Sequence, residues 1–175
     1  MHMYFLNTRV NPTGLAGTTI FSTFMACAAL KSDGSVVTWG HADYGGDSSS
    51  VQHELKKGVK TIYSNTNAFA ALKSDGSVVT WGHEDYGGDS HSVQNKLKKG
   101  VKTIYSTELA FAALMLDGSV VTWGDEELGG NSSRVQNEFD KGVKTIYSTG
   151  SAFAALMLDG SVVTWGNAKK SSYFI

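Results

Sequence analysis

The 175-residue sequence is nearly neutral, with 15 Lys and Arg against 16 Asp and Glu and a formal net charge of −1 at pH 7. This balance excludes a global attraction to nucleic acid or to an anionic membrane surface, so we expect no nucleic-acid partner. No apolar run reaches the ~18 residues of a membrane-spanning helix. The single cysteine, Cys27, excludes an internal disulfide framework and is compatible with a reducing, cytoplasmic compartment.

An internal repeat dominates the chain. The octapeptide DGSVVTWG begins at Asp33, Asp75, Asp117 and Asp159, a constant step of 42 residues without insertion or deletion. We therefore divide one repeat domain into an N-terminal extension, three full repeats, and a truncated fourth repeat with an apolar C-terminal tail: residues 1–18, 19–60, 61–102, 103–144 and 145–175. The extension alternates like a strand, and we expect it or the tail to pair with a sheet edge.

Each unit begins with three predicted strands. In the second unit, residues 59–64 (VKTIYS) alternate and are rich in β-branched and aromatic residues. Residues 68–73 (AFAALK) predict a strand buried on both faces, and residues 74–76 (SDG) predict a tight turn. Residues 77–81 (SVVTW) then return as a third strand, so the unit predicts a small antiparallel meander.

A short helix is predicted after the strands. Gly87-Gly88 ends the strand pattern, and Asp89-Ser90 offers capping oxygens. Val93 and Leu97 lie four residues apart, on one face of a helix of about ten residues. Gly100 suits the position after its C-terminus. Because two apolar contacts cannot stabilise such a helix alone, we expect it to dock on the sheet.

The fold class predicted is therefore mainly β with short helices, in four tandem β-β-β-α repeats. Such a unit cannot cover both faces of its own sheet, so neighbouring units must cover them. A propeller does this, either as four blades closed within one chain or as half of a larger ring completed by a second copy. A linear or curved stack is the competing arrangement.

One segment imitates a secretory signal. Residues 18–30 (TTIFSTFMACAAL) are fairly apolar and follow Arg9. The same stretch aligns with residues 61–72 and 103–114 inside the repeat, and this favours a structural role over a signal peptide.

The unit resembles the repeat of the regulator of chromosome condensation family, in a shortened form. The resemblance rests on VKTIY at 101–105, AFAAL at 110–114, DGSVVTWG at 117–124 and the Gly129-Gly130 pair. Where that family has a Gly-Gln-Leu-Gly loop, this chain has Tyr44-Gly-Gly-Asp47 and its counterparts. The resemblance implies β-propeller blades and, by analogy with the family, regulation of a small GTPase.

Residues that recur once per unit are interpreted as structural. The tryptophans suit packing between sheets, although a ring of them could also stack on sugars or bases. The Asp-Gly pairs suit hairpin turns, and spacing by 42 residues does not by itself cluster their carboxylates for a metal. The structural repeat positions are Asp33, Gly34, Trp39, Asp75, Gly76, Trp81, Asp117, Gly118, Trp123, Asp159, Gly160 and Trp165.

Positions at which the copies differ are the candidate binding residues. They follow the first strand of each unit or the Trp-Gly pair, and drift of free loops is the alternative explanation. The candidates are Phe24, Met25, His41, Asp43, His83, Asp85, Leu109, Asp125 and Glu127. No nucleophile elbow, phosphate-binding loop or metalloprotease motif is present, so we expect no catalytic residue, cofactor or metal.

These observations favour a non-catalytic repeat scaffold that binds a protein partner or associates with its own copies as a homo-oligomer. A multivalent lectin-like module, with one tryptophan-containing pocket per unit, is the alternative from another functional class. Regulation of a small GTPase depends on the family resemblance alone.

Overall fold

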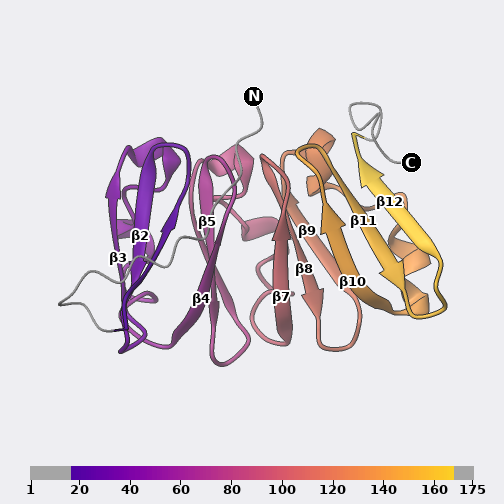
Figure 1. Ribbon diagram of the computed structural model, residues 1–175, viewed down its shortest axis with the longest axis horizontal. Helices are drawn as coiled ribbons and strands as arrows, with labels where there is room; N and C mark the ends of the chain where they lie inside the picture. Colours follow the sequence, from indigo (N-terminus) through magenta and orange to yellow (C-terminus); the bar gives the residue numbers. More distant parts are fainter. Residues whose placement is uncertain (1–16, 168–175) are drawn as a thin grey trace.

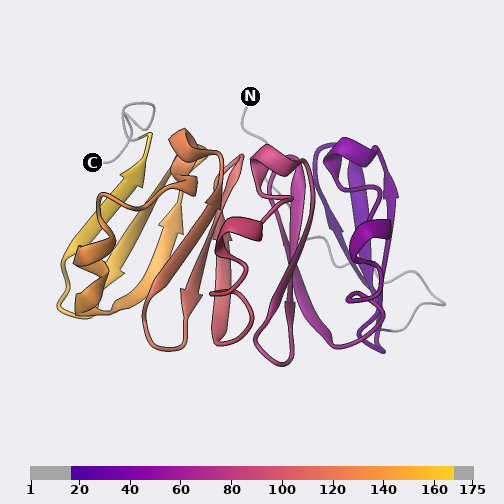
Figure 2. The same cartoon turned by 180° about the vertical axis from the view of Figure 1, so that it is seen from behind.

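A computed structural model describes residues 17–167. Within them, each set of three consecutive strands forms one three-stranded antiparallel sheet. The four sheets stand side by side in sequence order, with the first and the fourth at opposite ends (Figures 1 and 2). The predicted mainly β fold with short helices is confirmed, and the described residues form an open array of blades.

The strands recur with nearly constant bounds. The first sheet contains β1 (Thr19–Ser22), β2 (Ala26–Leu30) and β3 (Val36–Gly40). The second contains β4 (Val59–Ser64), β5 (Ala68–Lys73) and β6 (Val78–Gly82). The third contains β7 (Val101–Ser106), β8 (Ala110–Met115) and β9 (Val120–Gly124). The fourth contains β10 (Val143–Ser148), β11 (Ala152–Met157) and β12 (Val162–Gly166).

Three apolar cores lie between the four sheets. Successive side chains of a strand point to opposite faces, so each inner sheet contributes to two cores. In β5, Ala68 and Ala70 pack toward the third sheet, whereas Phe69 and Ala71 pack toward the first. Every residue of β5 except Lys73 is buried, as its composition predicted. The first strands of successive sheets also contact one another, β1 with β4, β4 with β7 and β7 with β10.

The helical segments lie on the side of the array away from β4, β7 and β10 (Figure 2). They are η1 (Ala42–Tyr44), η2 (Ser49–Val51), η3 (Glu84–Tyr86), η4 (His91–Val93), η5 (Glu126–Gly130) and η6 (Gln136–Lys141). They are short, mostly 3₁₀ turns, so the helical part of each unit is tighter than the ten-residue helix expected.

The docking of this segment follows the predicted face. The amide of Leu97 donates to the carbonyls of Val93 (3.3 Å) and Gln94 (3.1 Å), which is typical of a tight, bifurcated turn. Leu97 is fully buried, with Val93 beside it. The capping oxygen of Asp89 accepts from the amide of His91 at 2.7 Å. Gly100 follows with φ +77°.

The predicted edge pairing of the N-terminal extension and of the tail at 173–175 falls on residues outside the described range, apart from residues 17 and 18. The stretch that imitates a signal sequence forms β1 and β2 of the first sheet. Among residues 17–167, no helix has the length and apolar character needed to cross a membrane.

Candidate interaction surfaces

The aspartates of the DGS turns are engaged in their own hairpins. Oδ1 of Asp75 accepts hydrogen bonds from the amide (2.9 Å) and the hydroxyl (2.6 Å) of Ser77. The hydroxyl bond first, and the amide bond second, lower the pKa of Asp75 below its ordinary value of 3.8. The same pair of bonds recurs at Asp33, Asp117 and Asp159. These carboxylates therefore stabilise turns.

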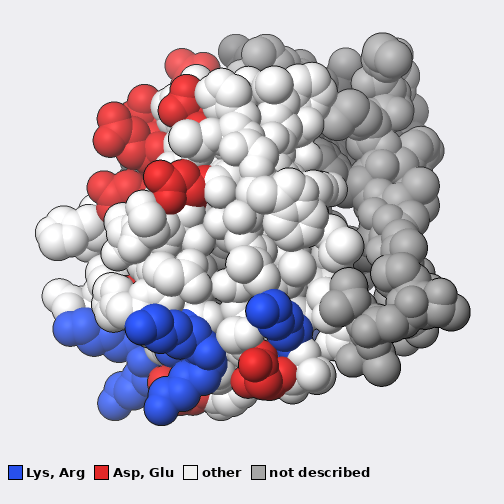
Figure 3. All heavy atoms as spheres, turned by 90° about the vertical axis from the view of Figure 1, so that its left-hand side faces the viewer, with Lys and Arg blue, Asp and Glu red and all other residues white. Residues whose placement is uncertain are grey.

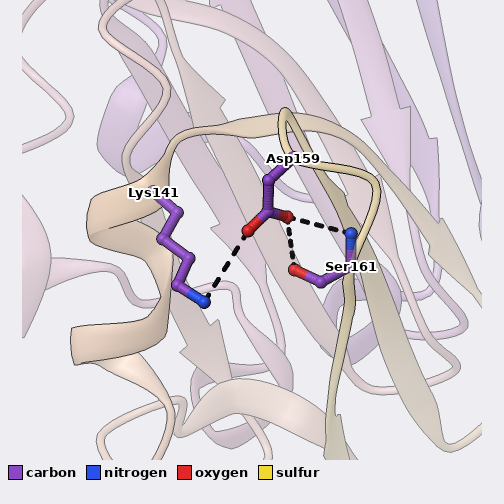
Figure 4. Close-up of polar contacts among 3 residues, drawn as sticks. All are labelled: Lys141, Asp159 and Ser161. Carbon is purple, nitrogen blue, oxygen red and sulfur yellow. Dashed lines mark hydrogen bonds and ion pairs between the residues drawn. The ribbon is translucent and has the colours of Figure 1, made fainter.

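The fourth turn has one additional partner (Figure 4). Lys141, at the end of η6, points toward Asp159 in the β11–β12 turn, and its Nζ lies 3.7 Å from Oδ2. Oδ1 of the same carboxylate accepts from the amide and the hydroxyl of Ser161. The linker before a sheet thus contacts the turn of that sheet. Both charged side chains are about half exposed, so this ion pair adds little to stability.

Three of the four tryptophans are buried between sheets. Trp81 is 3% exposed, stacks on Phe69 with 5.2 Å between ring centroids, and donates from Nε1 to the carbonyl of Gly45 at 3.0 Å. Trp123 and Trp165 make the same bond to the loops before them. None of the three is open to a ligand ring. Trp39 differs, because its ring is 48% exposed.

The Gly-Gly pairs are packing positions. Gly45 has φ +91°, and a Cβ there would lie 2.6 Å from Cδ2 of Phe69 in the next unit. A Cβ on Gly46 would meet the carbonyl of Gly40 at 2.2 Å. The loop therefore needs glycine in order to pack between two sheets, and this accounts for the pair without an anion ligand.

Both variable segments of each unit lie at one end of its sheet, because β1 and β3 are both antiparallel to β2. The amide of His41 donates to the carbonyl of Met25 at 2.9 Å, which joins the two segments. The hairpin tips are also linked from unit to unit. The bonds run from Phe24 N to Thr66 O (2.9 Å), from Thr66 N to Glu108 O (3.0 Å) and from Glu108 N to Gly150 O (3.0 Å). Variable residues thus form one continuous loop surface.

The first unit supplies the apolar part of the loop surface. Phe24 is 56% and Met25 48% exposed. Tyr44 lies near both candidate rings, with centroids 6.1 Å from Phe24 and 5.3 Å from His41. Nδ1 of His41 accepts from the amide of Asp43 at 3.3 Å, so this imidazole caps η1.

The second and third units supply an acidic groove of about 970 Å³. Three candidates, Asp85, Asp125 and Glu127, line it together with Glu84 and Glu126. His83 does not line this groove and stacks on Tyr86 at 4.3 Å, while Leu109 is half-buried in its hairpin. The described residues contain no group of three or more His, Cys, Asp or Glu arranged to hold a metal ion.

Several apolar residues are exposed although the sequence predicts that they are buried. Val37 and Trp39 on the first sheet, and Tyr147 and Val162 on the fourth, are 43–61% exposed, although their sequence equivalents in inner units are wholly or largely buried. One available signal was their position in the first or last copy of the repeat, and for Trp39 another was Cys27, which pairs with it where the other units have Phe. Within one unit their side chains look identical to core residues.

No protein-family model and no curated protein sequence matches the chain. Solved structures do resemble it in fold. The WD40 ectodomain of CRINKLY from the Arabidopsis thaliana receptor kinase ACR4 matches with a TM-score of 0.58 and 16% identity, over 90% of this chain and 55% of that chain. The ectodomain of the Physcomitrella patens receptor kinase CR4 matches with a TM-score of 0.60 and 17% identity, over 88% and 42%.

Yeast RCC1 (Prp20), in its structure bound to Kap60, matches with a TM-score of 0.56 and 21% identity, over 85% of this chain and 43% of that chain. The chain thus spans about half the length of these neighbours. At such identities the likeness concerns the fold alone. The chain has a propeller-like repeat fold of four three-stranded blades.

Proposed function

We propose that this protein is a non-catalytic scaffold that binds other proteins, or its own copies, through surface left free by blade packing. The unit is a shortened relative of the regulator of chromosome condensation repeat; support comes from the DGSVVTWG motif and from the fold shared with yeast RCC1. The proposed partner surface is the loop surface, formed by the hairpin tips and the segments after Trp-Gly.

One observation carries this proposal. The recurrent residues that suggest chemistry are engaged in folding, since the turn aspartates cap hairpins and three tryptophans are buried with their donors satisfied. The candidate variable residues lie at the same end of each sheet, where Phe24 and Met25 of the first unit are exposed and acidic side chains of the second and third units line a groove. A surface that combines exposed apolar residues with a polar groove is typical of protein binding.

The groove predicts the chemistry of the partner. Six carboxylates, Glu84, Asp85, Asp89, Asp125, Glu126 and Glu127, line it with a single lysine, Lys96. A basic peptide segment would complement this charge, whereas an acidic one would be repelled.

The burial of three tryptophans weighs against the lectin-like alternative with one glycan pocket per unit, because their rings are not accessible to a sugar.

The test is selection from a random-peptide display library on the immobilised protein. We expect enrichment of Lys- and Arg-containing peptides, with binding weakened at least about 10-fold by the double charge reversal Glu126→Lys/Glu127→Lys. The matched control is Glu138→Lys/Asp140→Lys, which changes net charge equally on exposed positions of the same unit outside the groove. Equal loss in both variants, or no selected peptide, would contradict the proposal, and binding on a glycan array instead would favour the lectin-like alternative.

A further inference from the structure

The outer side of the first sheet carries an apolar surface that is buried everywhere else in the chain. We call Ile20, Val37 and Trp39 the head face; they are 36%, 43% and 48% exposed. Their equivalents in the second unit, Ile62, Val79 and Trp81, are 3%, 4% and 3% exposed, because the preceding sheet and linker cover them. Figure 3 views this end of the array, where an uncharged middle lies between acidic and basic groups.

The fourth sheet carries the opposite half of the same interface. We call Tyr147, Leu156 and Val162 the tail face; Tyr147 and Val162 are each 61% exposed. The equivalents of Val162, Val78 and Val120, are 1% and 3% exposed, because the linker after their sheet and the sheet that follows it cover them. In β12 the alternate residues Val163 and Trp165 are buried, so only the face that would meet a following sheet is open.

The polar contacts between sheets are also left incomplete at the two ends. The hydroxyl of Tyr63 bonds to that of Thr103 at 3.0 Å, and Tyr105 repeats the bond with Thr145 at 3.1 Å. In this series Tyr147 of the tail face is the next tyrosine hydroxyl, and Thr19 carries the next threonine hydroxyl.

The ladder of hairpin tips ends in the same way. It runs by bonds from the amide of one tip to the carbonyl of the next, as far as Gly150. The amide of Gly150 and the carbonyl of Phe24 have no hydrogen bond within residues 17–167. An unused donor therefore stands at the tail end and an unused acceptor at the head end.

We infer that the head face of one copy binds the tail face of a second copy, so that two chains close one ring of eight sheets. This inference rests on the proposed scaffold function and names a second copy as one partner. Apart from the linker residues Leu55, Leu97 and Phe139, the two faces correspond to the two halves of an interface that the chain already makes three times. The parts of the solved structures that match this array of four sheets make up 55% and 43% of their chains, so the fold accommodates further sheets beside such an array.

Head-to-tail contact is heterologous, since two different surfaces meet, and it covers every such face only when the ring closes. An isologous dimer would pair the head face with itself. It would leave both tail faces exposed and would bring Trp39 against Trp39, for which the chain shows no precedent. In every interface within the chain, one face of a sheet meets the opposite face of its neighbour. This precedent favours the head-to-tail contact over the head-to-head one.

The test uses two variants, each of which disables one face of the full chain. Trp39→Asp places a carboxylate in the head face, and Val162→Asp places one in the tail face. Sedimentation equilibrium and native mass spectrometry should give a dimer for the wild type. Each single variant should be a monomer, with association weakened at least about 100-fold, because the contact would bury an unpaired charge.

The decisive sample is an equimolar mixture of the two variants. A Trp39→Asp copy keeps its tail face and a Val162→Asp copy keeps its head face, so one intact interface should join them into a 1:1 complex. That complex can neither close nor extend. Leu116→Asp is the matched control, because Leu116 is 74% exposed in a hairpin turn of the third sheet, away from both faces, and it should leave the wild-type mass unchanged.

A monomeric wild type at ~100 μM, a Val162→Asp variant that still dimerises, or a mixture without the 1:1 complex would each overturn the inference. Circular dichroism checks that both variants fold, and Val37→Asp replaces Trp39→Asp if the latter does not. Peptide binding at the acidic groove is measured on the same variants. If the protein binds peptides but never dimerises, this inference is wrong and the proposed function is still supported.

Discussion

The four tryptophans show how one residue type meets two different surroundings in the same repeat position. Trp81 packs on Phe69 of its own sheet and bonds to the carbonyl of Gly45, which is available only because another unit precedes it. Trp39 has the same neighbours along the chain but is half exposed. The sequence correctly indicated that this position suits a core, and the first unit differs locally in having Cys27 opposite its tryptophan, where the other units have Phe.

Removing the indole should therefore have unequal effects at the two positions. Trp81→Phe loses ring volume and leaves the buried carbonyl of Gly45 without its donor, so we expect the free energy of unfolding to fall by about 2–4 kcal/mol. Trp39→Phe should change it by less than about 0.5 kcal/mol in dilute solution, because that side chain packs on little. Urea unfolding of both variants measures this, and equal losses would show that Trp39 is covered.

The turn aspartates give stability a defined pH dependence. Hydrogen bonds from Ser77 and its equivalents lower the pKa of Asp33, Asp75, Asp117 and Asp159 in the folded state. The unfolded chain therefore binds protons first as pH falls. The contribution of these groups is complete above about pH 4 and is lost as the pH falls through 3.8 toward the folded values.

Asp75→Asn/Asp117→Asn should flatten this dependence, since an amide can still accept the turn hydrogen bonds but does not titrate. We expect a smaller loss of unfolding free energy between pH 6 and about pH 3 than in the wild type, measured by urea titrations across that range. Glu138→Gln is the control, because this exposed carboxylate lies outside the turns. A double variant with an unchanged pH slope would contradict the assignment.

At the scale of elements, the linker between the second and third sheets, residues 87–100, has the sequence pattern of a short helix, but its conformation depends on how it packs on the sheets. Its apolar pair, its capping aspartate and its terminal glycine were all predicted, and they act as expected in the second unit. Its conformation is tighter than an α-helix, because the amides of Val93, Gln94 and Lys96 bond to carbonyls three residues back. The amide of Val78 bonds to the carbonyl of Leu97, so a tertiary contact ties this segment to the sheet.

Alanine substitutions at two glycines distinguish the cost of a left-handed backbone from the cost of a steric clash. Gly160 has φ +87° with nothing within 4 Å of an added Cβ, so Gly160→Ala should cost only the left-handed conformation, roughly 1–2 kcal/mol. Gly87 has φ +97°, but its Cβ would lie 2.6 Å from Cδ2 of Phe111. Gly87→Ala should therefore cost about 1–3 kcal/mol more. Urea unfolding compares the two, and similar losses would mean that the loop can move away from Phe111.

At the scale of the whole molecule, an open array gives inner and terminal sheets different amounts of cover. The second and third sheets each contribute to two apolar cores, whereas the first and fourth each contribute to one. In repeat proteins stability is approximately a sum of unit and interface terms, so terminal units open more readily.

Hydrogen exchange tests this gradient directly. In dilute solution, amides of β5 and β8 should exchange more slowly than those of β2 and β11. Peptides must extend into the variable loops, because the strands of the third and fourth units, AFAALM, are identical. Raising the protein concentration should selectively slow β2 and β11 if a second copy covers the ends. Uniform protection at every concentration would contradict an open array.

The sequence by itself determined the repeat, its three strands, its turns and the burial of its central strand, because each depends on contacts within about 40 residues that every copy preserves. It also indicated where copies diverge, and therefore the loop surface. Only the tertiary structure decided that the described blades form an open array, that Asp85, Asp125 and Glu127 share a groove, and that Trp39 and Val162 are exposed. The physical reason is that a repeat encodes the interface between neighbours, whereas its ends depend on how many neighbours are present.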